Sequence, residues 1–439
     1  MNTHFMFDNT RGENMLLQFN FENFKSFREH TVLDMTADKI TEHASSVMHI
    51  GHEKVLPVCA IFGANASGKS NVLEAYAFMR NYVIRSFNYG GDLSDNENRK
   101  MPERTPFLFD QDSQNASSSF EVYFISSEDQ KGRTYNYGFS LNNRGVAEEW
   151  LNSQAKTSSK TRRIFYRSGN ELDMPGIPKK QQDNLRISLQ PETLIVSLGA
   201  KLKIDILMLV RSWFLTSEVS NFGGPLENVI LSRQLPAGFT EDHVQRQVLN
   251  YLHTFDSSIV GFDVKKVPVA DSNSARYEVY AEHQLNGSDQ TVSIPLAAES
   301  QGTLKMFAMY QKLRDVLADG GLFIIDELDS RLHPLLVRSF LQNFTNPDIN
   351  RRHAQIICTM HNDWQMDSGI LRRDEIWFTE KDVETGVSEL YSLSDFVDQD
   401  GLKIRKDEAL GKNYLLGKYG AIPDLRAFSP DIPKSIDKR

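Results

Sequence analysis

The 439-residue sequence is poor in cysteine and has no long apolar run, and each shortage excludes a class of protein. It has two cysteines, Cys59 and Cys358, each within a predicted buried strand. This usage favours reduced core residues over a disulfide framework and predicts a cytoplasmic protein. The 11 histidines show no ligand spacing relative to these cysteines, so the sequence does not indicate a zinc enzyme. No apolar run approaches the roughly 20 residues of a membrane span, and no signal-peptide pattern opens the chain.

Repeats, low-complexity tracts and sustained heptads are also missing, which excludes solenoids and long coiled coils. The formal net charge of −9 argues against a protein that coats nucleic acid nonspecifically, although it permits a local basic groove. The remaining composition, 40% hydrophobic and 24% charged, is that of an ordinary globular protein. Residues 1–14 and 424–439 are polar and patternless, so we expect flexible tails there.

A glycine-rich segment, IFGANASGKS at 61–70, has the spacing of a phosphate-binding loop. Its glycines let the backbone curl so that N–H groups face phosphate oxygens, while Lys69 reaches the β- and γ-phosphates and Ser70 holds Mg²⁺. The apolar segment 57–62 before it is typical of a buried strand, and helical spacing follows it. The predicted nucleotide-binding residues of this segment are Gly63, Asn65, Ser67, Gly68, Lys69, Ser70 and Asn71.

A second segment, GLFIIDELDSRLHP at 321–334, provides two carboxylates after a buried strand. Asp326 would emerge at the carboxyl end of that strand, where ligands bind in α/β sheets, and is the expected Mg²⁺ partner. Glu327 can act as the base for the water that attacks the γ-phosphate. The plainer alternative is a strand that ends in a solvated acidic turn.

Two further segments are less specific. In AESQGTLKMF at 298–307, Ser300 and Gly302 come directly before an amphipathic helix, and a helix N-cap with a glycine explains them equally well. In TMHN at 359–362, His361 follows a predicted strand and could sense a γ-phosphate, although a lone histidine there is usually structural.

The order of these motifs resembles the ABC-type ATPase heads of SMC, RecF and OLD proteins. It is more similar to the stand-alone AAA/ABC-like ATPases of bacterial phage-defence and abortive-infection loci, such as those of RloA, AbiL and PARIS type. The resemblance covers most of the chain from Met15, through NFKSF at 23–27, GANASGKSN at 63–71, ESQGT at 299–303, DELDSRLHP at 326–334 and YLLGKYGAIP at 414–423.

This resemblance implies an α/β fold, a P-loop NTPase of ABC-ATPase-head type. Its mixed sheet core would carry an antiparallel β-subdomain and a helical insertion. The expected parts are an N-terminal lobe at 15–168 with the phosphate loop, a mainly helical insertion at 169–268, and a C-terminal lobe at 269–423.

The resemblance also implies ATP and Mg²⁺ as cofactors and assigns roles to matching residues. Lys69, Glu327 and His361 would be catalytic, with His361 as the switch histidine and Asp329 as the D-loop acid. Ser300 and Gly302 resemble the ABC signature, which contacts the γ-phosphate bound by the other protomer. Lys25 and Ser26 could flank the nucleotide, Gln111 is a candidate Q-loop glutamine, and Met360 stands where we expect threonine more often.

The function that the resemblance implies is an anti-phage defence ATPase that senses infection and controls a separate effector, such as a nuclease or toxin encoded beside it. The chain would work as a homodimer or higher oligomer through an ATP sandwich. We expect its effector contact in the helical insertion, although the apolar helix at 202–214 could equally pack on its own head domain.

The alternative function is a RecF/SMC-like DNA-repair ATPase that binds DNA directly. Its best candidate surface is AKTSSKTRRIFYRSG at 155–169, a basic stretch that a solvated strand edge explains equally well. A nuclease within the chain is rejected, because only 78 residues (439 − 361) follow His361 and the acids at 398–400 are a weak signal.

Overall fold

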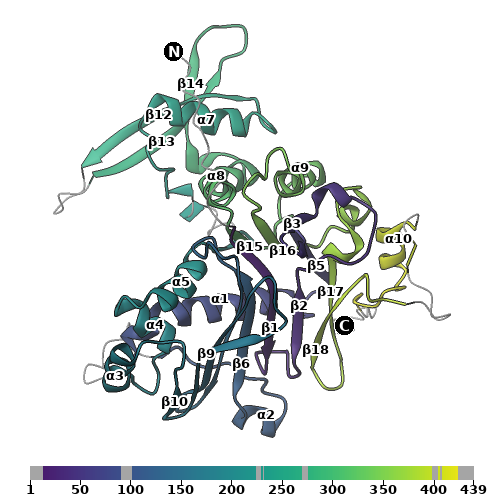
Figure 1. Ribbon diagram of the computed structural model, residues 1–439. Coiled ribbons are helices and arrows are strands. Elements are labelled where there is room, and N and C mark those ends of the chain that lie inside the picture. Colours follow the sequence, from purple (N-terminus) through teal and green to yellow (C-terminus); the bar gives the residue numbers. More distant parts are fainter. Residues whose placement is uncertain are drawn as a thin grey trace, which may run out of the picture.

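The computed structural model describes residues 13–89, 101–223, 229–230, 232–268, 275–397, 404–405 and 408–423. Two large β-sheets dominate this part of the chain, with a smaller sheet projecting beside helix α8 (Gln301–Asp319) (Figure 1). The expected mixed α/β architecture, with an antiparallel β-subdomain beside the sheet that contains the phosphate-loop strand, is confirmed.

The six-stranded sheet has the order β11-β15-β16-β5-β17-β18, and all neighbours are parallel except the last pair. Its strands come from both halves of the chain, so the phosphate-loop strand lies between strands from the C-terminal half. The bounds are β5 (Val58–Gly63), β11 (Glu218–Asn221), β15 (Leu322–Asp326), β16 (Gln355–Thr359), β17 (Ile376–Lys381) and β18 (Ser388–Ser392).

The seven-stranded sheet is antiparallel throughout, with the order β10-β9-β8-β7-β6-β1-β2. It joins the N-terminal strand to the hairpins that follow the phosphate loop. Its strands are β1 (Met15–Glu22), β2 (Thr31–Asp34), β6 (Ser118–Ile125), β7 (Thr134–Asn142), β8 (Gly145–Gln154), β9 (Thr161–Ser168) and β10 (Glu171–Asp173).

The small three-stranded sheet projects from the body together with helix α7 (Asp242–Leu252) (Figure 1). A hairpin with Asn286-Gly287 in its loop joins two of its strands, β13 (Ala275–Gln284) and β14 (Thr291–Pro295). The third strand is β12 (Ile259–Pro268), and β3 (Met48–Ile50) pairs with β4 (Glu53–Val55) elsewhere.

Local sequence signals explain the ends of the long helices. Helix α8 ends at Gly320, which adopts the left-handed conformation (φ 68°) that glycine favours at a helix C-terminus. Helix α9 (Pro334–Thr345) begins with proline, whose missing N–H would be unpaired there anyway. The other helices are α1 (Lys69–Arg85), α2 (Gln111–Asn115), α3 (Lys179–Ser188), α4 (Ile195–Lys201), α5 (Asp205–Leu215) and α10 (Leu410–Leu415). Short 3₁₀ turns lie at Ala44–Ser46, Ser86–Asn88, Leu296–Ala298, Asp363–Asp367 and Arg373–Glu375.

Two hydrophobic cores lie on opposite faces of the six-stranded sheet. Side chains of β5 alternate between them: Cys59 and Ile61 join one core with α1, whereas Ala60 and Phe62 join the other with α8 and α9. Figure 1 shows α1 on one side of β15 and β16, with α8 and α9 on the other. The period-two geometry of a strand covered on both faces produces this division.

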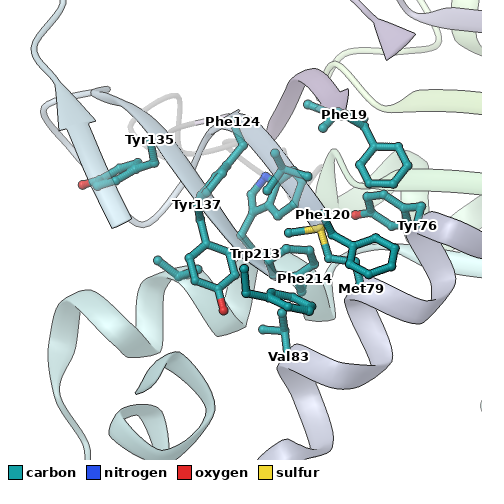
Figure 2. Packing of buried hydrophobic residues seen from close by; sticks show 14 of the residues in the cluster. Phe19, Tyr76, Met79, Val83, Phe120, Phe124, Tyr135, Tyr137, Trp213 and Phe214 are labelled. Atoms are coloured by element: carbon teal, nitrogen blue, oxygen red, sulfur yellow. The ribbon is translucent and has the colours of Figure 1, made fainter. Parts of the chain in front are cut away.

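The apolar helix α5 packs on its own head domain. Trp213 lies 4.5 Å from Phe124 of β6 between ring centroids, and Phe214 packs against Tyr137 and Tyr76. Figure 2 shows these rings converging with side chains of α1 and of the antiparallel sheet. Most of the apolar surface of α5 is therefore used within the chain, although Met208 and Leu215 remain 42% and 49% exposed.

The segment 169–268 is distributed over several parts of the molecule. Helices α3 to α5 lie with the antiparallel sheet and α1, strand β11 joins the edge of the six-stranded sheet, and α7 packs on β12 and α8. The buried carboxylate of Glu149 fixes α4 to β8, because it accepts hydrogen bonds from the backbone N–H groups of Ile195 and Val196.

Candidate nucleotide-binding site

The phosphate loop joins β5 to α1, and its two pattern glycines have positive φ. Gly63 has φ 148° and Gly68 has φ 115°. A Cβ on Gly63 would lie 2.4 Å from the carbonyl oxygen of Thr379, so the backbone of β17 leaves no space for a side chain. Ser67 closes the loop on the same strand, where its hydroxyl lies 2.6 Å from that of Thr379. These contacts hold the loop in the curled form that phosphate binding requires.

The Lys69 side chain lies inside this loop, with Nζ donating to the carbonyl oxygens of Gly63 (2.9 Å) and Ala64 (3.0 Å). Burial lowers the pKa of its ammonium, while the nearby acids Asp326, Asp329 and Glu327 oppose this shift. Lys69 is therefore a buried cation held among three carboxylates, placed to neutralise an anionic group in the loop.

The Ser70 hydroxyl and the Asp326 carboxylate face each other at the start of α1, with Oγ and Oδ1 3.1 Å apart. The Thr359 hydroxyl also donates to Asp326 Oδ1, at 2.6 Å. This set of hard oxygen donors fits Mg²⁺, which binds proteins through one or two carboxylates together with phosphates. Ser70 and Asp326 are the two predicted metal-binding residues, and the fold brings them together from positions 256 apart in the sequence.

The backbone of Glu327 has a positive φ of 53°, which is unusual for a residue with a side chain. Its N–H donates to the Thr359 hydroxyl at 2.7 Å, so Thr359 joins Asp326 and Glu327 to the next strand. Gly223 lies against the Glu327 carboxylate, since a Cβ there would be 2.5 Å from Oε2. Such backbone strain is typical of positions that aim a functional side chain.

The Asp329 side chain contacts the backbone of the segment that contains His361. The Asp329 carboxylate accepts hydrogen bonds from the N–H groups of His361 (2.8 Å) and Asn362 (2.6 Å). Asp329, the predicted D-loop acid, thus fixes the loop that carries the predicted switch histidine, within the same chain. Met360 is fully buried in the core, and its N–H donates to the carbonyl oxygen of Ile61, which extends the pairing of β16 with β5.

Comparison with models of known protein families places the chain in one of them. A family model described as "AAA domain, putative AbiEii toxin, Type IV TA system" matches residues 58–363. The chain belongs to this AAA-domain family. The match begins at the strand before the phosphate loop, extends past His361, and supports the predicted ABC/AAA-like ATPase class.

No curated protein matches the chain. Among solved structures, the chain is similar to an Smc head bound to the C-winged helix domain of ScpA, with 14% identity, a TM-score of 0.42, and 86% of this chain and 97% of that chain covered. It is also similar to an Smc head domain with a coiled coil and joint from Pyrococcus yayanosii, with 12% identity, a TM-score of 0.40, and coverage of 87% and 97%.

In this AAA domain, Ser300 caps helix α8, and its hydroxyl accepts a hydrogen bond from the N–H of Thr303. Gly302 lies close to the turn after Glu327, because a Cβ there would be 3.3 Å from the carbonyl oxygen of Arg331. Gly302 therefore lies beside the turn that carries Asp329. The N-cap explanation of Ser300 is confirmed, and the signature role of Ser300 and Gly302 stays a prediction.

Lys305 is a buried residue of the site that the sequence patterns do not reveal. Its ammonium donates to the carbonyl oxygens of Glu327 (2.8 Å) and Ser330 (3.0 Å), and the residue has no exposed surface. Burial lowers the pKa of Lys305 to about 8, against the opposing charges of Asp329 and Glu327. A lysine in a predicted amphipathic helix is expected to be exposed. The only sequence signal for Lys305 is therefore its position five residues after Ser300.

Asn221 is a second residue that the patterns miss. It ends β11, is paired in register with Asp326, and its Nδ2 lies 3.4 Å from Asp326 Oδ2. The Q-loop candidate Gln111 instead begins the short helix α2, where its carbonyl oxygen accepts a hydrogen bond from the Asn115 amide. The amide beside the Asp326 carboxylate is therefore that of Asn221, in a four-residue strand with no distinctive pattern.

The segment with Lys25 and Ser26 contacts the start of α1. The Asn71 amide donates to the Ser26 hydroxyl at 2.7 Å, and Lys25 forms an ion pair with Glu74. Asn71 therefore supports this segment with its side chain, whereas Asn65 is exposed at the tip of the phosphate loop.

The basic stretch at 155–169 is only partly available to a ligand. Arg167 is buried and donates to carbonyl oxygens of Thr193 and Gly169, and Arg163 forms an ion pair with Asp173. Lys156, Lys160 and Arg162 remain exposed.

Both cysteines are free and buried, in neighbouring strands. Within the described ranges, histidine, cysteine and acidic side chains form no group of three or more that could hold a metal ion. Over the same ranges, each helix is too short or too polar to cross a membrane. The acids at 398–400 and the tail at 424–439 lie outside the described residues, as do residues 1–12 of the N-terminal tail.

Proposed function

We propose that this protein is a Mg²⁺-dependent ATPase that acts as a nucleotide-controlled switch in anti-phage defence. The observation that carries the proposal is the hydrogen-bonded set of Ser70, Asp326, Thr359 and Glu327 beside Lys69. It combines a phosphate-binding cation, a metal-binding pair and a carboxylate base in one place, which are the parts that phosphoryl transfer to water needs.

Each residue has a separate task in this mechanism. Lys69 would leave its two carbonyl acceptors to bind the β- and γ-phosphates, while N–H groups of the loop and of the α1 start hold the remaining oxygens. Mg²⁺, when bound by Ser70 and Asp326, would neutralise developing charge on the phosphate oxygens. Glu327 would orient the attacking water and accept its proton, with Thr359 fixing its backbone.

The switch would depend on two copies of the chain. Ser300 and Gly302 begin a helix that is tied through Lys305 to the turn carrying Glu327. If this helix start contacts the γ-phosphate held by a second copy, nucleotide binding closes the dimer and hydrolysis releases it.

The proposed role is to sense infection and to hold or release a separate effector, such as a nuclease or toxin. The family description, which names a putative AbiEii toxin and a type IV system, supports a place in such a locus. A direct DNA-repair role has less support, because Arg167 is buried and Arg163 is paired with an acid.

The chemistry is tested by measuring Mg²⁺-dependent ATP hydrolysis of the purified chain and of Lys69→Ala. The variant should lose ATP binding and turnover, whereas Lys54→Ala, at an exposed lysine of β4, should behave as wild type. Equal turnover in Lys69→Ala and the wild type would refute the site.

The shared site is tested by mixing two inactive variants. Ser300→Arg should bind ATP without hydrolysing it, and mixing it with Lys69→Ala should restore part of the activity, because one composite site in the mixed dimer is whole. Absence of recovery, with both variants folded and co-assembled, would contradict a shared site.

The defence role is tested by co-expression with the product of the neighbouring gene, followed by pull-down with and without ATP. Nucleotide-dependent capture supports effector control. Tight DNA binding with a steep salt dependence, and no captured neighbour, would support the repair function instead.

A further inference from the structure

A cleft of about 1190 Å³ opens directly beside the phosphate loop. Ala64, Asn65, Ala66 and Ser67 form one wall, and the other walls come from Phe107 and Phe109, from 379–386, and from 421–423. Its volume exceeds the roughly 300–1,000 Å³ of most small-molecule sites. The cleft therefore has room for a group that continues from the phosphates.

The aromatic wall of this cleft is unusual for a surface. Phe109 is 72% exposed, and its ring meets the buried Phe107 edge-on, with centroids 5.6 Å apart and planes at 87°. Gly386 gives space to the ring, since a Cβ there would lie 2.7 Å from Phe109 Cδ2. The Lys381 ammonium lies 5.6 Å from the centroid of the Phe109 ring. A large exposed ring held in this way is suited to stacking on a flat ligand that displaces Lys381 or shares the ring with it.

The segment that carries these rings is firmly anchored. The N–H of Phe107 donates to the Asn23 side chain at 2.9 Å, and Lys25 N–H donates to the carbonyl oxygen of Thr105 at 2.8 Å. Arg104 donates further to the carbonyl oxygens of Gln114 and Ala116. The aromatic wall is thus built before any ligand arrives, which lowers the entropic cost of binding.

Several polar side chains of the cleft are already bonded within the protein. The Asp110 carboxylate accepts from the N–H and hydroxyl of Ser113, and Asp382 accepts from both donors of Thr385. Glu380 accepts from the Tyr391 hydroxyl. These hydrogen bonds take up part of the acceptor capacity of the three carboxylates, which leaves them fewer sites for reading the edge of a base.

We infer that this cleft binds the nucleoside part of the nucleotide, with the base stacked on Phe109 and recognised by its face more than by its edge. The inference rests on the proposed function, because it continues from the phosphate loop. It assigns roles to Phe109 and Gly386, and predicts that adenine and guanine nucleotides bind with similar affinity.

The experiment measures equilibrium binding, with Mg²⁺, of three probes to the full chain: the β,γ-imido analogues of ATP and GTP, and inorganic tripolyphosphate. Phe109→Ala should weaken both nucleotide analogues by about 5- to 100-fold, the range expected for one lost stacking contact, and leave tripolyphosphate unchanged. Phe109→Trp should restore nucleotide affinity. Leu108→Ala, at an exposed neighbour outside the cleft, serves as the matched control.

The outcomes separate this inference from the proposed function. Wild-type nucleotide affinity in Phe109→Ala, or an equal loss for tripolyphosphate, would overturn the stacking site while leaving the ATPase intact. A guanine analogue that binds more than 100-fold more weakly than the adenine analogue to the wild type would overturn recognition by the face of the base. If the wild type binds none of the three probes, the proposed function falls and this inference with it.

Discussion

The ammonium of Lys305 lies 2.8 Å from the carbonyl oxygen of Glu327 and donates a hydrogen bond to it. Helix α8, which begins at the signature candidate Ser300, is thereby attached to the turn that carries the proposed base. The same ammonium bonds the carbonyl oxygen of Ser330, so one buried cation closes the turn between the two residues. If the start of α8 moved, these hydrogen bonds would move the backbone of Glu327 with it.

Replacing Lys305 by methionine should slow hydrolysis by about tenfold or more while changing ATP affinity little. The turn would lose its two hydrogen bonds, and small displacements of a catalytic group cost up to about 100-fold in rate. Two buried carbonyl groups without partners should also destabilise the fold by about 1–3 kcal/mol. Steady-state kinetics and urea denaturation measure both effects, with Arg314→Met on the exposed face of α8 as the control. Unchanged turnover would show that the contact is purely structural.

Replacing Gly223 by alanine should lower the turnover number by about 10- to 100-fold with little loss of stability. The new Cβ would lie 2.5 Å from Glu327 Oε2. The Glu327 side chain can turn away from it at small cost, but its carboxylate would then leave the position from which it orients the attacking water. Gly223 is not among the residues with positive φ, so alanine fits its backbone. Binding of an ATP analogue, measured beside the ATPase assay, should remain at the wild-type level; a parallel loss of binding would point to a misfolded loop instead.

Replacing Glu327 by glutamine should preserve ATP binding and reduce turnover by about 10²- to 10⁴-fold, because an amide cannot accept the proton of the attacking water. The slow variant should accumulate as an ATP-bound dimer, visible by light scattering. Glu389→Gln, at an exposed carboxylate of β18, is the control. Rapid turnover in Glu327→Gln would assign the base to another residue.

Replacing Glu149 by glutamine should change how stability depends on pH. Burial raises the pKa of this carboxyl from 4.5 to about 7, against the opposing effects of Arg167 and the α4 N–H groups. The folded state therefore binds more protons than the unfolded state between pH 4.5 and 7. The stability that protonation of Glu149 contributes is complete below that window and is lost as the pH rises through 7.

The measurement is urea denaturation of the wild type and of Glu149→Gln at pH 5.5 and pH 8. The free energy of unfolding of the wild type, minus that of the variant, should be smaller at pH 8. A difference that stays constant over this range would show that Glu149 does not titrate there.

The elements that the sequence predicts well are those with local causes. The phosphate loop needs glycine at two fixed positions, and the strand and helix around it follow from apolar periodicity, so the sequence alone is enough to place β5 and α1. The same holds for α8, β15, α9 and β16, where caps and apolar runs coincide. The alternation of apolar and polar residues in β1 predicts a half-buried strand, but helices and the second sheet leave only Glu22 of it exposed.

The sequence did not predict the residues whose positions depend on partners far away in the chain. Asn221 reaches the site because β11 pairs with β15 across 105 positions of sequence, and four residues carry too little pattern to indicate a strand. Lys305 and Glu149 are charged residues in buried positions, and their identity alone argues for exposure. Backbone carbonyl and N–H groups, together with nearby opposite charges, offset the free-energy cost of their burial in the fold.

The position of β5 between β16 and β17 has a consequence for any attempt to divide the protein. The phosphate loop is encoded in the first half of the gene, yet both strands that flank it, and the carboxylates that face Lys69, are encoded in the second. A fragment ending near residue 223 would leave β5 with two bare edges, and the complementary fragment would present β16 and β17 with a gap between them. Neither fragment contains both the phosphate loop and the strands that flank it, so we expect neither to form this sheet without the other.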